Sequence, residues 1–269
     1  MTLDDLPGHA LGTDYLEHEV FARLKEYASF YDFLSFHISS WTTTGTTAIL
    51  NMDTHVFSSM YGTLESIHDI LFKGRISDAY TLLRKFYDVT IINVYSNLYL
   101  EENFDLDNFI VAQINDWLNG SKQIPEYRVM SQYIKKSSRV QGITEILAKD
   151  DTHKNIRDRC NNYTHYNFYR NLLVNDNAVY LKNRVWALEI FIKDLDAIFI
   201  QHFAYLFYFK EHYMMATDYI DYLEVGMTPE KNAQYFVANF VQEIFNKIIK
   251  AQRPDLAAEI KSKISMQLE

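Results

Sequence analysis

Apolar residues recur three or four positions apart along most of this chain, which is the spacing of one face of an α-helix. From Ser77 the pattern continues without a break as far as Leu98. Similar stretches predict further helices over about residues 14–37, 48–72, 105–118, 126–136, 140–149 and 151–173. We therefore expect an all-α protein built mainly from long helices.

Residues that begin or end helices mark several of these boundaries. Asp14 and Glu17 have the spacing of a capping box, in which two side chains bond the first backbone N–H groups of a helix. Gly74 and the pair Asn119-Gly120 each follow a helical stretch directly, where a left-handed residue commonly ends a helix. The sequence therefore predicts a helix start near residue 14 and helix ends near residues 74 and 119.

The longest stretch without a helix-breaking residue runs from Leu181 to about Glu224. Its apolar residues fall on most faces of a helical wheel, as in a helix that neighbours bury on several sides. We expect it to be the long buried central helix of a single helical bundle. Because the chain has no internal repeat and no separating linker, residues 14–269 are predicted to form one all-helical domain after an N-terminal arm over 1–13.

Two more helices are predicted near the C-terminus. Thr228-Pro229 has the residues of a helix start, and this helix is expected to reach about Lys250. Arg253-Pro254-Asp255 opens an exposed terminal helix in which apolar residues follow at four-residue steps. Irregular segments are expected at Trp41–Thr47, at Asn175–Asn177 and, as a strand-like stub, at Ala178–Tyr180.

Composition agrees with this fold and narrows the class of function. Gly (8) and Pro (4) are scarce, which argues against a turn-dense β fold. The net charge of −9 gives no overall attraction to nucleic acid, so such a ligand needs a local basic patch. The single cysteine excludes an intrachain disulfide. With no visible signal peptide and charges within the most apolar run, we expect a cytoplasmic protein that does not enter the membrane.

The polar stretch from Asn155 to Arg170 interrupts this apolar pattern. On a helix, Ile156, Cys160 and Tyr163 form one stripe facing the core, so Cys160 is expected to be a small buried hydrophobe rather than a nucleophile. The other side gathers polar and aromatic residues within about 120°. They are Asn155, Asp158, Arg159, Asn162, His165, Tyr166 and Tyr169.

Arg159 and His165 give this stretch its candidate chemistry. A continuous helix separates them by roughly 9 Å along its axis, with Asn162 between them. Arginine suits phosphate because its planar fork donates hydrogen bonds in pairs, and histidine suits proton transfer because its pKa lies near neutrality. Five basic and three acidic residues over 149–170 also make a mild local basic patch. The stretch therefore predicts a phosphate-binding site.

The segment Arg159-Cys-Asn-Asn-Tyr-Thr-His165 resembles the Arg-x(4–6)-His motif of the HEPN superfamily, whose members are helical bundles. A second segment, residues 79–88, is similar to a helix with Leu-Leu-Arg and a following acidic residue in some HEPN-like families. In this chain those residues are Arg84 and Asp88. The HEPN-like region covers about residues 50–225.

The resemblance implies a metal-independent endoribonuclease, of the kind found in toxin or phage-defence systems. His165 would activate the ribose 2′-hydroxyl and Arg159 would hold the scissile phosphate. Other residues would position the RNA or support the site: Asn161, Asn162, Tyr166 and Tyr169 for the first role, and Asp158, Arg84 and Asp88 for the second. One motif per chain implies a symmetric homodimer, and a partner protein such as an antitoxin.

The residues alone leave other readings open. The same polar face fits a non-catalytic helical module that binds RNA, a nucleotide or a partner protein. A small-molecule enzyme using Arg84, Asp88 and His165 is a third reading. Arg84 and Asp88 are also spaced as a simple i,i+4 ion pair. Arg159 equally suits an ion pair with Asp158 or with an acid on another helix, and His165 suits a bond to a neighbouring helix.

Neither a metal nor a cofactor is expected. The nine histidines include no H-E-x-x-H spacing. The chain also lacks a P-loop, a G-x-G-x-x-G loop and a G-x-S-x-G elbow. The candidate chemistry therefore depends on the polar stretch.

Overall fold

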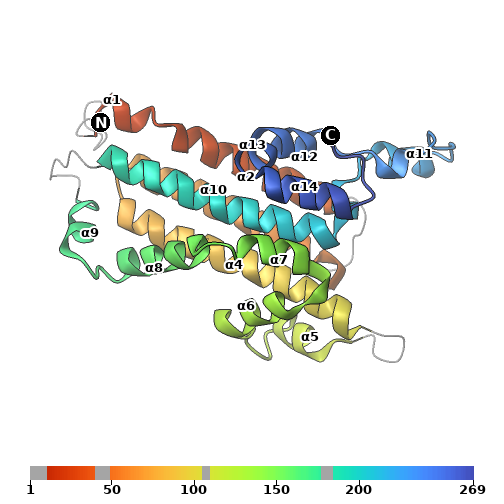
Figure 1. The fold of residues 1–269 in the computed structure, drawn as a ribbon, viewed down its shortest axis with the longest axis horizontal. Coiled ribbons are helices and arrows are strands. Elements are labelled where there is room, and N and C mark those ends of the chain that lie inside the picture. Colours follow the sequence, from red (N-terminus) through yellow and green to blue (C-terminus); the bar gives the residue numbers. More distant parts are fainter. Residues whose placement is uncertain (1–10, 40–48, 105–109, 177–183) are drawn as a thin grey trace. The chain divides into compact units, whose positions relative to one another are not determined.

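The fold is all-α, as the pattern of apolar residues predicts. The computed structural model describes residues 11–39, 49–104, 110–176 and 184–269. Helices make up the regular structure of these residues (Figure 1). The β pairing among them is a single isolated bridge between Met215 and Val237. None of the described helices is both long enough and apolar enough to cross a membrane.

The chain divides into two compact units, which are described separately. The first unit comprises Met1–Asp32, Phe57–Thr90 and Asp151–Phe199, and the second comprises Phe33–Val56, Ile91–Asp150 and Ile200–Glu269. Four long helices contribute residues to both units: α2 (Glu19–Ser39), α3 (Met52–Phe72), α4 (Ile76–Asn103) and α10 (Arg184–Phe209). The single domain expected from residue 14 onward stays a prediction.

Aromatic rings fill the core of the first unit. The ring of Phe199 stacks on Tyr27 with centroids 3.7 Å apart and meets Tyr31 edge-on at 5.7 Å. Tyr31 also contacts Phe57 and Phe86, so α2, α3, α4 and α10 all supply rings to this core. Such rings bury large apolar areas, which stabilises the packing. The remaining helices of this unit are α1 (Thr13–Leu16), α8 (Thr152–Thr164) and α9 (Tyr169–Leu173).

The predicted helix over 14–37 is wrong in its first part. It is broken between α1 and α2, and Gly12, with φ 77°, rather than Asp14 precedes the first helical residue. At the break, Nδ1 of His18 accepts a hydrogen bond from the backbone N–H of Val20 at 3.1 Å. A histidine therefore caps the start of α2, which the sequence pattern did not indicate.

The second unit contains many short helices besides its share of the long ones. Its α-helices are α5 (Ala112–Leu118), α6 (Tyr127–Lys136), α7 (Gln141–Leu147), α11 (Asp218–Glu224), α12 (Asn239–Ile244), α13 (Lys250–Gln252) and α14 (Pro254–Lys263). Short 3-10 turns lie at Ile49–Asn51, Ser138–Val140, Glu211–Met214 and Ala233–Tyr235, and a π-helical turn at Phe245–Ile249.

The predicted helix from Leu181 to Glu224 is wrong beyond Phe209, where α10 ends. The backbone that follows pairs with another segment instead. The N–H of Ala216 donates to the carbonyl of Phe236 at 2.8 Å, and the N–H of Ala238 donates to the carbonyl of Met214 at 2.7 Å. These tertiary bonds override the local helical pattern. Within α10 itself, most side chains are buried, as expected of a core helix.

Two predictions for the C-terminal part also need correction. The helix expected to start at Thr228-Pro229 begins instead at Asn239, after a left-handed residue at Asn232 (φ 69°). The terminal helix does begin at Pro254, as predicted, but its apolar side is not exposed. Leu256, Ala257 and Ile260 are buried, so this helix packs into the second unit.

Several other boundaries are confirmed. α6 matches its predicted range and α7 lies within its range, whereas α4 begins as predicted and continues beyond Leu98 to Asn103. Gly74 (φ 76°) follows α3, and Gly120 (φ 70°) follows α5. The predicted loop at Trp41–Thr47, the stub at Ala178–Tyr180 and most of the N-terminal arm lie outside the described residues.

A buried polar network surrounds Asp53 in the second unit. One carboxylate oxygen of Asp53 accepts hydrogen bonds from the amides of Asn93 (2.7 Å) and Asn97 (2.8 Å), and the other accepts one from the hydroxyl of Tyr213 (2.7 Å). Nε2 of His202 lies 2.9 Å from the amide oxygen of Asn93. Because burial lowers the pKa of His202 to about 3, its ring is neutral and donates this bond. The Asp53 carboxylate thus joins α3 to α4 and to the 3-10 turn Glu211–Met214, and His202 connects α10 to the same network through Asn93.

Candidate functional site

The polar stretch folds as two helices rather than one. α8 ends at Thr164, α9 begins at Tyr169, and the predicted continuous helix over 151–173 is wrong. The chain changes direction at Tyr166, whose φ of 48° lies in the left-handed region. A non-glycine residue is uncommon there, because its Cβ crowds the backbone.

Backbone hydrogen bonds explain this helix end. The N–H of Tyr166 donates to the carbonyl of Tyr163 at 3.2 Å, and the N–H of Asn167 donates to the carbonyl of Asn162 at 3.0 Å. These two bonds form a Schellman motif, which satisfies the last carbonyls of a helix. The amide of Asn171 adds a bond to the same Asn162 carbonyl at 2.9 Å. Asn162 therefore serves to close the helix end, and its side-chain oxygen accepts from the amide of Asn167.

The new helix end changes the predicted site. His165, Tyr166 and Tyr169 do not continue the face of α8 that carries Arg159, so the separation calculated for a straight helix does not apply. His165 caps the helix and is exposed. Asp158 is exposed on α8. The structure thus does not place the residues expected to act together on one helix face. They lie in three separate groups on α8 and α9, which are described in turn below.

The core-facing part of α8 is as predicted. Ile156 and Cys160 are buried, and burial raises the pKa of the Cys160 thiol to about 12. Such a thiol carries no thiolate at neutral pH and is not a nucleophile. Tyr163, the third residue of the stripe, stacks on Tyr80 of α4 with ring centroids 4.1 Å apart.

On one side of this stripe, Arg159 forms an ion pair with Asp194 of α10. Nε of Arg159 donates to Oδ2 of Asp194 at 2.7 Å, and Nη2 lies 3.3 Å from Oδ1. The hydroxyl of Tyr80 also donates to Oδ2, at 3.3 Å. The Asp194 side chain is only 6% exposed, and burial raises its pKa although the bonds from Arg159 oppose this shift. Arg159 therefore compensates a buried carboxylate, which matches the ion-pair reading of this residue.

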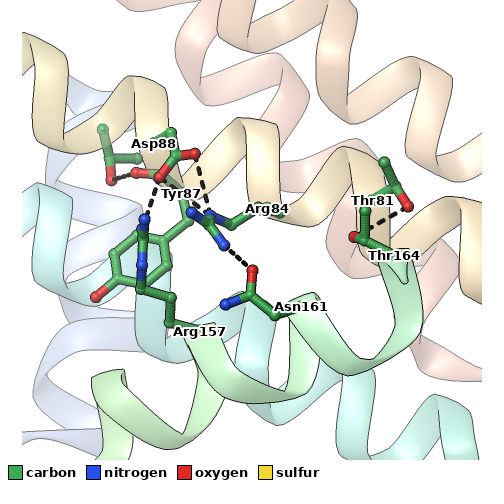
Figure 2. A network of polar contacts seen from close by, with 8 residues as sticks. Thr81, Arg84, Tyr87, Asp88, Arg157, Asn161 and Thr164 are labelled. Atoms are coloured by element: carbon green, nitrogen blue, oxygen red, sulfur yellow. Dashed lines mark hydrogen bonds and ion pairs between the residues drawn. The ribbon is translucent and has the colours of Figure 1, made fainter. Parts of the chain in front are cut away.

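On the other side of α8, four polar side chains form what we call the α4–α8 cluster: Arg84, Asp88, Arg157 and Asn161. Nε of Arg84 donates to both oxygens of Asp88, at 3.2 and 3.0 Å, and Nη1 of Arg157 donates to Oδ1 at 2.8 Å. Nη1 of Arg84 donates to the amide oxygen of Asn161. Figure 2 shows these four side chains converging from the two helices. Asp88 thus orients Arg84 and Arg157, and its predicted i,i+4 pairing with Arg84 is confirmed.

One member of the α4–α8 cluster, Arg157, is not among the site residues predicted from the sequence. Arg157, Asn161 and Thr164 lie at i, i+4 and i+7 of α8, and all three contact α4 residues. Thr164 meets Thr81 at 3.2 Å in the same interface (Figure 2). The spacing of these three α8 residues in the sequence indicates this third stripe of α8, between the core-facing stripe and the face that carries Arg159. Two guanidiniums share one carboxylate, so the cluster has a net charge of +1.

Neutralising the shared carboxylate tests this cluster. We expect Asp88→Asn to lower the free energy of unfolding by about 1 kcal/mol, because the carboxylate is partly exposed and such pairs contribute little individually. The loss should shrink in high salt, which screens exposed charges. Urea unfolding at low and high NaCl measures both values. An unchanged loss in high salt would contradict an electrostatic role for Asp88.

Beyond the end of α8 lies a group of exposed aromatic and basic side chains, here called the α8–α9 surface: His165, Tyr166, Phe168, Tyr169 and Arg170. Tyr169 is 74% exposed, Phe168 51% and Tyr166 43%. The guanidinium of Arg170 lies over the ring of Phe168, 5.5 Å from its centroid. Such a concentration of exposed rings within six residues is uncommon on a surface that has no partner.

The α8–α9 surface is anchored to the rest of the first unit. Asn171 of α9 is buried, and its carbonyl accepts a hydrogen bond from the hydroxyl of Ser77. The side-chain oxygen of Asn175 accepts from the backbone N–H of the same serine at 3.2 Å, and its amide donates to the Asp78 carboxylate at 3.0 Å. These bonds hold α9 and the residues after it against the start of α4. The backbone that carries the exposed rings of the α8–α9 surface is therefore attached to the first unit.

Across the described ranges, no group of three or more His, Cys, Asp or Glu side chains lies close enough to hold a metal ion. No protein-family model, no curated protein and no solved structure matches the chain. The resemblance to HEPN proteins therefore stays a prediction that depends on the residues quoted for it.

Proposed function

We propose that this protein binds single-stranded RNA through the α8–α9 surface. The observation that carries the proposal is the exposure of Tyr166, Phe168 and Tyr169 beside His165 and Arg170. Aromatic side chains stack on unpaired bases, and this stacking contributes about 1–3 kcal/mol per base. Basic side chains beside them contact the phosphates between successive bases.

Local charge and the HEPN resemblance both favour RNA as the ligand. α8 and α9 together carry four Lys or Arg residues, namely Lys154, Arg157, Arg159 and Arg170, against a single acid, Asp158. The local charge of α8 and α9 is therefore positive, whereas the net charge of the whole chain is −9. Single-stranded RNA is the favoured form, because its bases are available for stacking and those of a duplex are not.

Binding is favoured over cleavage because Arg159 already has a partner. In the predicted ribonuclease, this arginine stabilises charge on the scissile phosphate. Here its Nε and Nη2 donate to the buried carboxylate of Asp194, and withdrawing them would leave that carboxylate without its counter-ion. A module that binds RNA without cleaving it avoids this loss. We therefore propose RNA binding, rather than RNA cleavage, as the function.

Cleavage is the second candidate, and one observation favours it. The Arg159 side chain is 37% exposed, and its described bonds use Nε and Nη2 and not Nη1. Nη1 would then contact a phosphate while Asp194 stays paired. His165 would take the proton of a ribose 2′-hydroxyl, whose oxygen would attack phosphorus as the bond to the 5′-oxygen breaks. The products would be a 2′,3′-cyclic phosphate and a 5′-hydroxyl, whose oxygen takes its proton from water. In this version we propose a cytoplasmic homodimer of the toxin or defence type, held by an antitoxin.

Fluorescence anisotropy with a labelled single-stranded RNA of mixed sequence, in EDTA, tests the proposal. We expect Tyr169→Ala to weaken binding roughly tenfold, since it removes the most exposed ring from the stack. Tyr235→Ala is the matched control, because Tyr235 is an exposed tyrosine of the second unit. It should bind as the unchanged protein does.

The same samples, run on a denaturing gel, distinguish recognition from cleavage. Intact RNA is expected throughout. Fragments that form with the unchanged protein, but not with His165→Ala or Arg159→Ala, would replace the binding proposal with the ribonuclease. If Tyr169→Ala binds RNA as well as the unchanged protein does, the binding proposal is wrong. If the unchanged protein neither binds nor cleaves RNA, both versions are wrong.

A further inference from the structure

The second unit contains an open groove of about 650 Å³. Three segments line it: the last turns of α2, the chain entering α11, and the chain entering α12. The lining side chains that matter here are Phe33, Phe36, Asp218, Asp221 and Phe240. The groove is thus apolar at its base and acidic at one edge.

Contacts between its segments hold the floor of this groove together, although its rings are exposed. The bridge between Met215 and Val237 joins the two segments beside α2. The ring of Phe240 lies 5.9 Å from that of Phe33 and 5.7 Å from that of His37. Yet Phe36 is 76% exposed, and Phe33 is more than half exposed. Two exposed phenylalanines beside these contacts provide an anchor for apolar side chains of a partner.

The helix beside the groove, α11, is also uncovered. None of its residues is buried, and large apolar side chains at Leu223, Val225 and Met227 are exposed on it or directly after it. A helix of seven residues has little stability of its own in water, since helix nucleation is unfavourable. A short helix with no fully buried residue and exposed apolar side chains at and after its end is therefore suited to packing against another molecule.

Charge identifies the kind of partner. Residues 211–230 contain five acidic residues and no lysine or arginine. Asp218 and Asp221 lie in the groove lining itself, one helical turn apart, and Glu224 follows on α11. This edge repels nucleic acid and anionic lipid, and it attracts cationic groups. A second copy of a chain with a net charge of −9 is a poor electrostatic match.

We propose that this groove binds a basic, amphipathic segment of a partner protein. Apolar side chains of the segment pack on Phe33 and Phe36, and its lysines or arginines pair with Asp218 and Asp221. This is the mode in which an amphipathic helix lies in an apolar groove and flanking charges set its orientation. The inference is independent of RNA binding, because it uses other residues in the other unit.

A designed peptide tests the groove directly. The probe is a fluorescent helical peptide of about 14 residues with leucines on one face and lysines on the other. We expect it to bind the full chain, and to bind Phe36→Ala and the pair Asp218→Asn with Asp221→Asn roughly tenfold more weakly. Phe104→Ala is the matched control, because Phe104 is another exposed phenylalanine of the second unit. Circular dichroism of each variant verifies folding.

Two further measurements make the outcome decisive. A peptide with glutamate in place of lysine should not bind, and one with alanine in place of leucine should bind weakly. If all protein variants bind the first peptide equally, or if none binds it, the groove is not a docking site for basic segments. If sedimentation shows self-association of the chain that Phe36→Ala abolishes, the occupant is a second copy and the proposal is overturned.

Discussion

Asp53→Ala is expected to lower the free energy of unfolding by about 3–4 kcal/mol. The substitution leaves the amides of Asn93 and Asn97 and the hydroxyl of Tyr213 without their shared acceptor in a buried site. Each unsatisfied buried donor costs about 1–3 kcal/mol, and the removed carboxylate recovers part of that. Urea unfolding followed by circular dichroism measures the loss.

Asp53→Asn is the matched control, with a loss of about 1 kcal/mol or less. Its amide oxygen can accept from Asn93 and Asn97, and its amide nitrogen can donate to the hydroxyl oxygen of Tyr213. Equal losses for the alanine and asparagine variants would show that the hydrogen-bond network does not stabilise this unit. A loss below about 1 kcal/mol for alanine would do the same.

The same carboxyl gives a pH dependence whose sign follows from burial. Burial raises the pKa of Asp53 although bonds from Tyr213 and Asn97 oppose the shift. The folded protein then holds this proton to higher pH than the unfolded chain does. Stability from this group is greatest below the unfolded pKa of about 4, and it is lost as pH rises toward the folded pKa. Asp53→Asn should therefore gain stability relative to the unchanged protein as pH rises through that window, in urea unfolding at each pH.

Asp194→Ala is expected to lower the free energy of unfolding by about 2–3 kcal/mol. It removes the counter-ion of Arg159 and the acceptor of the fully buried Tyr80 hydroxyl. The loss is smaller than for a wholly buried pair, because Arg159 is 37% exposed and can turn toward water. Urea unfolding is again the measurement.

A double-mutant cycle isolates the ion pair itself. Arg159→Met should also be destabilising, because it leaves the Asp194 carboxylate buried without a cation. Combining the two substitutions should cost less than the sum of the single losses by about 1 kcal/mol or more, since the pair is removed as a unit. Strictly additive losses would mean that the two side chains do not stabilise each other.

Local spacing predicted part of the site correctly. The pairing of Arg84 with Asp88 follows from their i,i+4 spacing on one long helix, and the burial of Cys160 follows from its place between Ile156 and Tyr163. Both depend only on the periodicity of a single helix, which the sequence specifies well. The α-helical class follows from the same periodicity.

Tertiary contacts determined the rest, and local spacing does not identify the partner of a side chain on another helix. The partner of Arg159 lies on α10, and the partner of Arg157 lies on α4. The end of α8 depends on a left-handed tyrosine at position 166, where glycine is the usual signal. The segment that follows α10 forms backbone bonds between residues 214–216 and 236–238 instead of continuing the helix.

These corrections change what the polar stretch is expected to do. The sequence predicts one helix face that carries Arg159 and His165. The structure instead divides the polar residues of α8 and α9 among three surfaces. One is the ion pair of Arg159, one is the α4–α8 cluster and one is the α8–α9 surface. Only the last combines high exposure with aromatic and basic side chains, so it carries the proposed RNA binding.

Photo-crosslinking tests this central claim most directly. RNA containing 4-thiouridine is crosslinked to the unchanged protein, and trypsin then cleaves after Arg159 and Arg170. The resulting peptide from Cys160 to Arg170 contains all five residues of the α8–α9 surface, including its three exposed rings. We expect the crosslinked nucleotide on this peptide. A crosslink found only on peptides from elsewhere in the chain would contradict the account.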